Sequence, residues 1–135
     1  MGRLDNKVAV ITGGALGMGE AACTLFAAEG AKVVIADISM EEGERLLNKI
    51  KGYGGEAVFV KADVSKASDA KKMIDTAIDK FGQLNILYNN AGILGPMGVS
   101  TADFSEEDAE KLISVNFKGV FLGIKYAIPE MIKSG

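Results

Sequence analysis

The sequence of 135 residues contains no histidine and only one cysteine. Without histidine, this chain cannot contain a Ser-His-Asp or Cys-His catalytic arrangement, histidine acid–base chemistry or histidine-ligated zinc. The single cysteine, Cys23, cannot form a disulfide within the chain, and such a composition is typical of a reducing compartment. Any catalysis must therefore use other residue types, and we expect no metal site and a cytoplasmic location.

Long apolar runs and an excess of positive charge are also missing. No apolar stretch approaches the roughly 20 residues that a membrane-spanning helix needs, and the N-terminal residues lack the pattern of a signal peptide. The 15 basic residues stand against 18 acidic ones, which gives a net charge of −3 and a pI of about 5.0. This balance argues against a surface for nucleic acid or anionic membrane. We therefore expect neither among the partners.

What the chain does contain is a regular alternation of short apolar segments and longer segments with helical periodicity. We expect strands at residues 7–12, 32–37, 57–61 and 84–88, and helices at about 16–29, 40–51, 67–81 and 106–133. No linker, repeat or low-complexity segment interrupts them, so residues 1–135 are interpreted as one domain. The alternation predicts an α/β fold, namely a doubly wound parallel sheet of about four strands between two helical layers.

A glycine-rich segment joins the first expected strand to the first expected helix. It runs Thr12-Gly13-Gly14-Ala15-Leu16-Gly17-Met18-Gly19. Glycines allow the backbone to turn tightly and approach a ligand, and a helix N-terminus presents free N–H groups and a partial positive charge. The segment therefore predicts a dinucleotide site. Glycine spacing alone is a weak signal in a chain with 17 glycines, so an ordinary strand-to-helix turn remains the alternative.

Asp37 ends the second expected strand, 18 residues after Gly19. An acid at this place in dinucleotide folds accepts hydrogen bonds from the adenosine ribose and repels a 2′-phosphate. No cation occurs among the nearby residues Gly14, Ala15, Leu16, Ile38 and Ser39. The sequence therefore favours NAD over NADP, and a solvated aspartate at a strand end is the alternative.

Polar and small residues also follow the third and fourth expected strands. They are Ala62-Asp63-Val64 and Asn89-Asn90-Ala91-Gly92. Both segments fall on the carboxyl edge of the sheet, where ligands bind in open α/β folds. Asp63 is positioned to accept from an adenine amino group, and Ala91-Gly92 would let backbone approach the ribose. Taken alone, the second segment is also typical of a plain turn.

Three local patterns predict structure rather than chemistry. Ser39 followed by Glu42 is typical of a capping box at a helix start. Cys23 lies among apolar helical neighbours, which indicates a buried thiol. Gly119 and Gly123 have G-x-x-x-G spacing, which in this helix indicates close packing rather than a dimer motif.

Taken together and in order, these motifs resemble the short-chain dehydrogenase/reductase family over essentially the whole chain. The matching residues are Thr12-Gly13-x-x-x-Gly17-x-Gly19, Asp37, Asp63-Val64, Asn89-Asn90-Ala91-Gly92 and Asn116 in Val115-Asn116-Phe117. The resemblance implies a Rossmann-type fold, NAD as the cofactor and a small alcohol or ketone as the substrate. It also implies that the long last helix contributes to a homo-oligomer interface.

The resemblance further implies a contact for each matching residue. Gly13, Leu16, Gly17, Met18, Gly19 and Asp37 would contact the pyrophosphate and ribose. Asp63 and Val64 would flank the adenine, and Asn90, Ala91 and Gly92 would border the adenosine ribose. Ile38 would also belong to the cofactor-binding residues. Thr12 and Asn89 would brace the strands. Asn116 matches the asparagine of the family's catalytic tetrad, which holds a water in the proton relay.

The sequence departs from the family in its catalytic residues. The family's serine and Tyr-x-x-x-Lys pair lie downstream of the last helix, and neither Tyr53, Tyr88 nor Tyr126 is followed by a lysine four residues later. We therefore expect an N-terminal, cofactor-binding portion that cannot catalyse hydride transfer alone, because that reaction needs a general acid or base on the substrate oxygen. A non-catalytic dinucleotide-binding module and one half of a split enzyme remain the alternatives.

Overall fold

The structure is a computed structural model that describes residues 2–135, and its centre is a parallel sheet with strand order β3-β2-β1-β4. The strands are β1 (Val8–Thr12), β2 (Lys32–Asp37), β3 (Ala57–Lys61) and β4 (Ile86–Tyr88). Strand β1 pairs with β2 on one edge, Val10 opposite Val34, and with β4 on the other, Val10 opposite Leu87. All five residues of β1 are buried, as expected for a central strand covered on both faces. The predicted fold class is confirmed.

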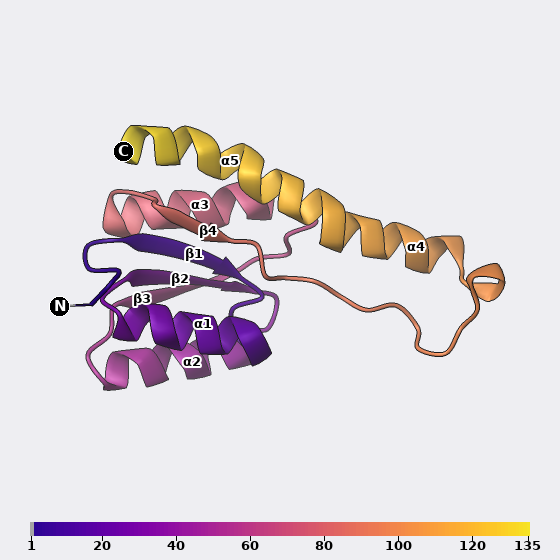
Figure 1. Ribbon diagram of the computed structural model, residues 1–135, viewed down its shortest axis with the longest axis horizontal. Helices are drawn as coiled ribbons and strands as arrows, with labels where there is room; N and C mark the ends of the chain where they lie inside the picture. The colour runs from indigo at the N-terminus through magenta and orange to yellow at the C-terminus, as the bar shows by residue number, and fades with distance from the viewer. Residues whose placement is uncertain (1) are drawn as a thin grey trace.

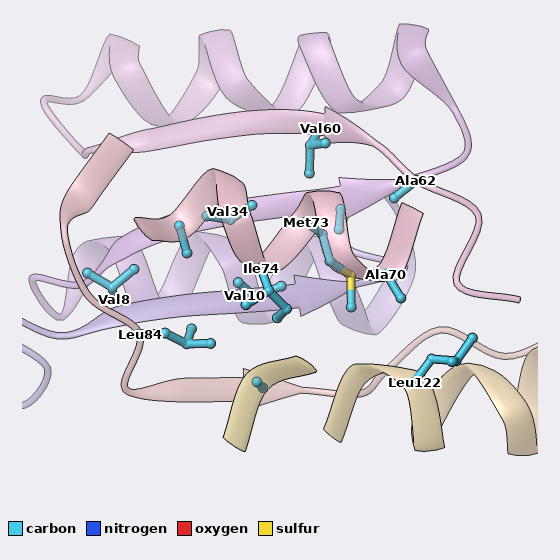
Figure 2. Close-up of a cluster of buried hydrophobic side chains, with 13 residues drawn as sticks. Val8, Val10, Val34, Val60, Ala62, Ala70, Met73, Ile74, Leu84 and Leu122 are labelled. Atoms are coloured by element: carbon cyan, nitrogen blue, oxygen red, sulfur yellow. The ribbon is translucent and has the colours of Figure 1, made fainter. Parts of the chain in front are cut away.

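Helices cover both faces of this sheet (Figure 1). Helices α1 (Gly17–Ala28) and α2 (Met40–Gly52) lie on one face, and α3 (Ala67–Phe81) and α5 (Gly119–Ser134) on the other. Each face has its own apolar core. Figure 2 shows the core under α3 and α5, where Val10, Val34, Met73 and Leu122 meet. The other core joins β1 and β2 to α1 and α2 and contains Cys23, which is fully buried as predicted.

The helix expected at about 106–133 is present as a continuous helical segment, Glu106–Ser134, but it is not α-helical throughout. Helix α4 (Glu106–Ile113) is followed by a π-helical turn at Ser114–Lys118 and then by α5. The side chain of Asn116, in the middle of the wide turn, forms two hydrogen bonds with the backbone of Ile93, which lies far away in sequence. Helical periodicity does not report such a contact, since an inserted residue only widens one turn. Helix α4 and the loop before it extend beyond the sheet (Figure 1).

Smaller differences from the expected boundaries have local causes. Helix α1 begins at Gly17 because Leu16 is extended, with φ −138° and ψ 160°. Strand β4 begins at Ile86, since the side chain of Asn85 takes the N–H of Val8 at 2.8 Å. Only half of the capping box forms: Ser39 accepts from the Glu42 N–H, but the Ser39 N–H donates to Asp37.

The pair Gly119 and Gly123 serves close packing, as predicted. A Cβ on Gly119 would come within 2.8 Å of the Val64 side chain, and one on Gly123 within 2.6 Å of the Asn89 side-chain oxygen. Helix α5 therefore lies against the segments that follow β3 and β4. Within residues 2–135, no helix is long and apolar enough to cross a membrane.

Candidate functional site

The topology places a crevice at the carboxyl ends of β1 and β4. The chain continues from β1 outward to β2 and β3, and then returns to the opposite edge of β1 to form β4. Loops that leave two neighbouring strands in opposite directions separate, and ligands of open α/β folds bind in the gap. The glycine-rich segment leaves β1 at this point, and Asn89-Asn90-Ala91-Gly92 leaves β4 beside it.

Two polar side chains join these two loops. The hydroxyl of Thr12, which is 1% exposed, accepts from the Asn90 N–H at 3.1 Å and the Ala91 N–H at 3.0 Å. It also donates to the Tyr88 carbonyl at 3.4 Å. In return the amide of Asn90 donates to the carbonyls of Thr12 and Gly13, at 3.0 and 3.1 Å. The brace that was expected from Thr12 therefore involves the side chain of Asn90, whose predicted position was the ribose border.

The glycine-rich turn ends in an open helix N-terminus. No side chain caps α1, so the first N–H groups of the helix point out of the turn without a side-chain acceptor. At Gly17, which has φ +56°, a Cβ would meet no atom within 4 Å, whereas a Cβ on Gly19 would collide with the Gly13 carbonyl. The turn is therefore closely packed on its inner side and open on its outer side. This is the environment that a pyrophosphate needs.

Asp37 connects the end of β2 to the glycine-rich turn. Its Oδ2 accepts from the Ala15 N–H at 3.0 Å, and its Oδ1 accepts from the Ser39 N–H at 2.9 Å. A carboxylate has about four acceptor positions, so both oxygens keep capacity for a further donor. Asp37 thus orients the turn while it faces the cavity beside it.

Sequence reasoning missed a cation beside this turn. Arg45, on the second turn of α2, donates from Nη2 to the Ala15 carbonyl at 3.4 Å. Its guanidinium also forms ion pairs with Glu20 of α1, at 2.8 Å, and with Glu42, at 2.7 Å. The expectation that no cation is nearby is therefore wrong, because packing of α2 on α1 brings Arg45 to Ala15 from 30 residues away.

These ion pairs affect the ionisation of both partners. The Arg45 guanidinium, with Lys49 at 3.2 Å, lowers the pKa of Glu20 below its ordinary value. Glu20 and Glu42 in turn raise the pKa of Arg45. All of these groups are partly exposed to solvent, which weakens the pairs.

A cavity of about 550 Å³ opens where the four strands end. The predicted residues that line it are Gly13, Asp37, Ile38, Asp63, Val64, Ala91 and Gly92. The residues that were not predicted are Ala62, Ser65, Ile93, Lys111, Ser114 and Val115. The last three come from α4 and the π-helical turn, and the proximity of Ser114 and Val115 to Asn116 was the only signal in the sequence. Leu16, Gly17, Met18, Gly19, Asn90 and Asn116 lie outside this lining.

Hydrogen bonds from Ser65 hold the carboxylate of Asp63 in its ionised form, in which it can only accept hydrogen bonds. The hydroxyl and the N–H of Ser65 both donate to its Oδ1, at 2.6 and 3.0 Å. These hydrogen bonds hold the pKa of Asp63 below its ordinary value, with Lys66 a weaker contribution from 3.9 Å. The Asp63 N–H donates to Asp69, which fixes the strand end. Asp63 therefore lines the cavity as an anion whose Oδ2 accepts no hydrogen bond from the described residues and lies 3.9 Å from the Lys66 ammonium.

Asn116 forms a closed pair with the loop after β4. Its side-chain oxygen accepts from the Ile93 N–H at 2.8 Å, and its side-chain nitrogen donates to the Ile93 carbonyl at 2.9 Å. Both polar atoms of the side chain are thus used for structure. Leu94 and Met97, farther along that loop, are exposed.

Comparisons with known proteins agree with this geometry. The family model described as short chain dehydrogenase matches residues 7–135. The chain belongs to the short-chain dehydrogenase family. Tropinone reductase-like 1 of Erythroxylum coca is 45% identical over 133 residues, which are 97% of this chain and 48% of that protein. The 2,5-dichloro-2,5-cyclohexadiene-1,4-diol dehydrogenase LinX of Sphingobium indicum is 46% identical, over 98% of this chain and 52% of that protein.

Solved structures of the short-chain dehydrogenase family have the same fold. A short-chain dehydrogenase/reductase from Burkholderia phymatum in complex with NAD superposes with a TM-score of 0.92 and 33% identity. The match covers 98% of this chain and 47% of that one. The chain therefore spans about half the length of the relatives that it matches.

The site residues fit a nicotinamide dinucleotide. The uncapped N-terminus of α1 and the open position at Gly17 suit a pyrophosphate, and the anionic groups Asp37 and Asp63 suit hydroxyl and amino donors. In the part of the chain that the structure describes, no group of three His, Cys, Asp or Glu side chains could hold a metal ion.

Proposed function

We propose that this chain is the NAD-binding portion of an oxidoreductase that transfers hydride between a small alcohol or ketone and NAD. The observation that carries the proposal is a cavity lined by Asp37, Asp63 and Gly13, together with the uncapped N-terminus of α1, which begins in the same glycine-rich turn as Gly13. This arrangement offers N–H donors for phosphates and carboxylate acceptors for the adenosine half of the cofactor. The bound nicotinamide supplies the hydride chemistry.

The pyrophosphate is bound at the glycine-rich turn. The N–H groups of Gly17, Met18 and Gly19 begin α1, where the helix dipole favours an anion. Gly13 and Leu16 belong to the same turn. Any side chain at Gly17 would occupy the open side of the turn.

The adenosine half occupies the cavity. Asp37 accepts from the ribose hydroxyls while it holds Ala15, and Asp63 accepts from the adenine amino group. Ile38 and Val64 provide apolar contact for the base, and Ala91 and Gly92 border the ribose. Asn90 orients this border through Thr12. Because the Asp37 carboxylate repels a 2′-phosphate, NAD is preferred over NADP.

Proton transfer to the substrate oxygen needs a general acid or base, which none of the motifs in this chain supplies. No tyrosine of the chain precedes a lysine by four residues, and the relatives are about twice as long. Asn116, on the π-helical turn, stabilises the loop that borders the cavity, and to hold a water of the proton relay, as its match to the family implies, it would have to share or release one of its two hydrogen bonds to Ile93. A dinucleotide-binding module without catalysis and one half of a split enzyme are the competing functions.

The proposal extends to assembly and location. Six apolar side chains of α4 and α5 and of the turn between them are exposed in one row, which suits an interface between copies of the protein. The acidic composition and the single buried cysteine suit the cytoplasm.

Isothermal titration of the intact protein with NAD and with NADP tests the cofactor assignment. We expect saturable binding of NAD and weaker binding of NADP. The Asp37→Ala variant should lose NAD affinity and discriminate less between the two, whereas Asp75→Ala, which removes an exposed carboxylate of α3, is the matched control. Absence of binding at millimolar NAD would overturn the proposal.

A further inference from the structure

Arg45 lies in a small charged cluster between α1 and α2, next to the glycine-rich turn. Glu20 accepts from two of its nitrogens, at 2.8 Å from Nη2 and 3.3 Å from Nη1. Glu42 accepts from Nε at 2.7 Å. Every nitrogen of the guanidinium is therefore directed at a carboxylate. Lys49 approaches Glu20 at 3.2 Å, and among the described residues it forms no hydrogen bond with the turn.

The cluster is connected to the ribose side of the cavity through one buried residue. Ala15 is fully buried, its N–H is bound by Asp37 and its carbonyl by Arg45. A cation and an anion thus lie on opposite sides of a single residue. Asp37 lines the cavity, whereas Arg45 does not.

We propose that Arg45 is a specificity-determining residue for the cofactor. Glu20 and Glu42 bind its guanidinium and so prevent it from pairing with a 2′-phosphate beside Asp37. A 2′-phosphate is thereby rejected twice, by repulsion from Asp37 and because the Arg45 guanidinium is already bound. This inference rests on the proposed dinucleotide function.

The physical basis is competition for one guanidinium. Arginine binds phosphate and carboxylate with the same forked donor geometry, so a phosphate can replace a carboxylate only where the carboxylate is weakened. Neutralising Asp37 removes repulsion but leaves Arg45 bound to two acids. Rejection of an unwanted ligand by an unpartnered charge is a general means of specificity.

The test compares four variants of the intact protein by titration with NAD and NADP. They are Asp37→Ala, Asp37→Ala with Glu20→Gln and Glu42→Gln, and this triple variant with either Arg45→Met or Lys49→Met. We expect the triple variant to bind NADP about tenfold more tightly than Asp37→Ala alone, because a charge-assisted pair with phosphate becomes available. Arg45→Met should abolish this gain, and Lys49→Met should preserve it.

The ratio of NADP to NAD affinity separates specificity from structure. Loosening of the turn would weaken both cofactors alike and leave the ratio unchanged, which would overturn the inference. A gain that survives Arg45→Met would also overturn it, since another cation such as Lys111 would then be responsible. If the triple variant does not fold, Asp37→Ala with Glu42→Gln should show a smaller gain of the same sign, and no gain there would overturn the inference. Failure of the unchanged protein to bind either cofactor would instead contradict the proposed function.

Discussion

At the scale of single residues, one threonine hydroxyl connects the two central loops of the site. Thr12 has three hydrogen-bond partners in the segment from Tyr88 to Ala91, and its side chain is buried. A buried donor that loses its acceptor costs about 1–3 kcal/mol. Two N–H groups donate to this one oxygen, so its removal should destabilise both the glycine-rich turn and the loop after β4.

Thr12→Val tests this connection, because valine keeps the shape and removes the hydroxyl. We expect the free energy of unfolding to fall by about 1–3 kcal/mol, since the N–H groups of Asn90 and Ala91 lose their acceptor. Urea denaturation measures the change. Thr76→Val is the matched control, because its hydroxyl is exposed and donates only within its own helix. Equal effects of the two substitutions would contradict the prediction.

The thiol of Cys23 should be unreactive in the folded protein. Burial raises its pKa to about 12, and Asp37 and Glu20 contribute in the same direction. The thiolate is the reactive form, so a thiol reagent at pH 8 should label Cys23 only as fast as the protein opens. Labelling as rapid as in urea would contradict this.

The same pKa predicts a dependence of stability on alkaline pH. The unfolded thiol ionises near pH 9 and the folded one near 12. Protonated Cys23 therefore contributes fully below pH 9, and the free energy of unfolding declines as the pH rises from 9 to 12. Cys23→Ala should reduce the slope in this range.

At the scale of elements, the strands and all the long helical segments were predictable, whereas the π-helical turn that divides the last segment was not. Strands β1 and β2 are nearly continuous apolar runs because both their faces are covered, and that property is local. The π-helical turn contains Asn116, whose side chain pairs with Ile93, 23 residues away, so that contact is not a local property of the sequence. The position of Arg45 beside Ala15 is likewise not local in the sequence, because only the packing of α2 on α1 brings the two residues together. The motifs near the strand ends predicted most of the residues that line the cavity. The presence of Lys111 and Ser114 in the lining was not predictable, because it is set by where α4 and the π-helical turn lie.

The π-helical turn should hold the loop after β4 through one side chain. Asn116→Ala removes both hydrogen bonds to Ile93, and the exposed site limits the cost to about 1 kcal/mol. Hydrogen exchange of the peptide that contains Ile93 should accelerate about fivefold, with little change in β1.

Two variants control for this effect. Asn116→Asp keeps an acceptor for the Ile93 N–H but loses the donor, so its exchange should be intermediate. Ser105→Ala removes the N-terminal cap of α4 and should affect α4 alone. Unchanged exchange at Ile93 in Asn116→Ala would show that the loop is held by other contacts.

At the scale of the whole molecule, the two faces of the last helical segment differ. Leu122, Gly123 and Ala127 are buried toward the sheet. On the opposite side lies a row of apolar side chains with spacings of three and four residues, in which Phe117 is 74% exposed. The row consists of Ile113, Phe117, Phe121, Ile124, Ile128 and Ile132. Such a row is the surface that the proposed interface between copies of the protein would bury.

Phe121→Lys should weaken self-association of the intact protein. A buried aromatic at the centre of an interface contributes about 2 kcal/mol or more, so we expect the dissociation constant to rise by more than tenfold. Sedimentation velocity over a range of concentrations measures it. Leu25→Lys, which places the same charge at an exposed apolar position of α1 outside this row, is the matched control. If Phe121→Lys leaves the oligomeric state unchanged but lowers the free energy of unfolding, the row is buried within one copy of the protein and not between copies, which would contradict the prediction.

The link between Thr12 and Asn90 also sets an order of events during synthesis. The two residues are separated by 78 positions. At about 5–20 residues per second, Asn90 leaves the ribosome several seconds after Thr12. Throughout that interval β1 can pair with β2 but has no partner on its other edge, and the glycine-rich turn has no anchor. The segment that is translated first is therefore among the last to reach its final form, and nascent chains should remain dependent on chaperones until β4 has emerged.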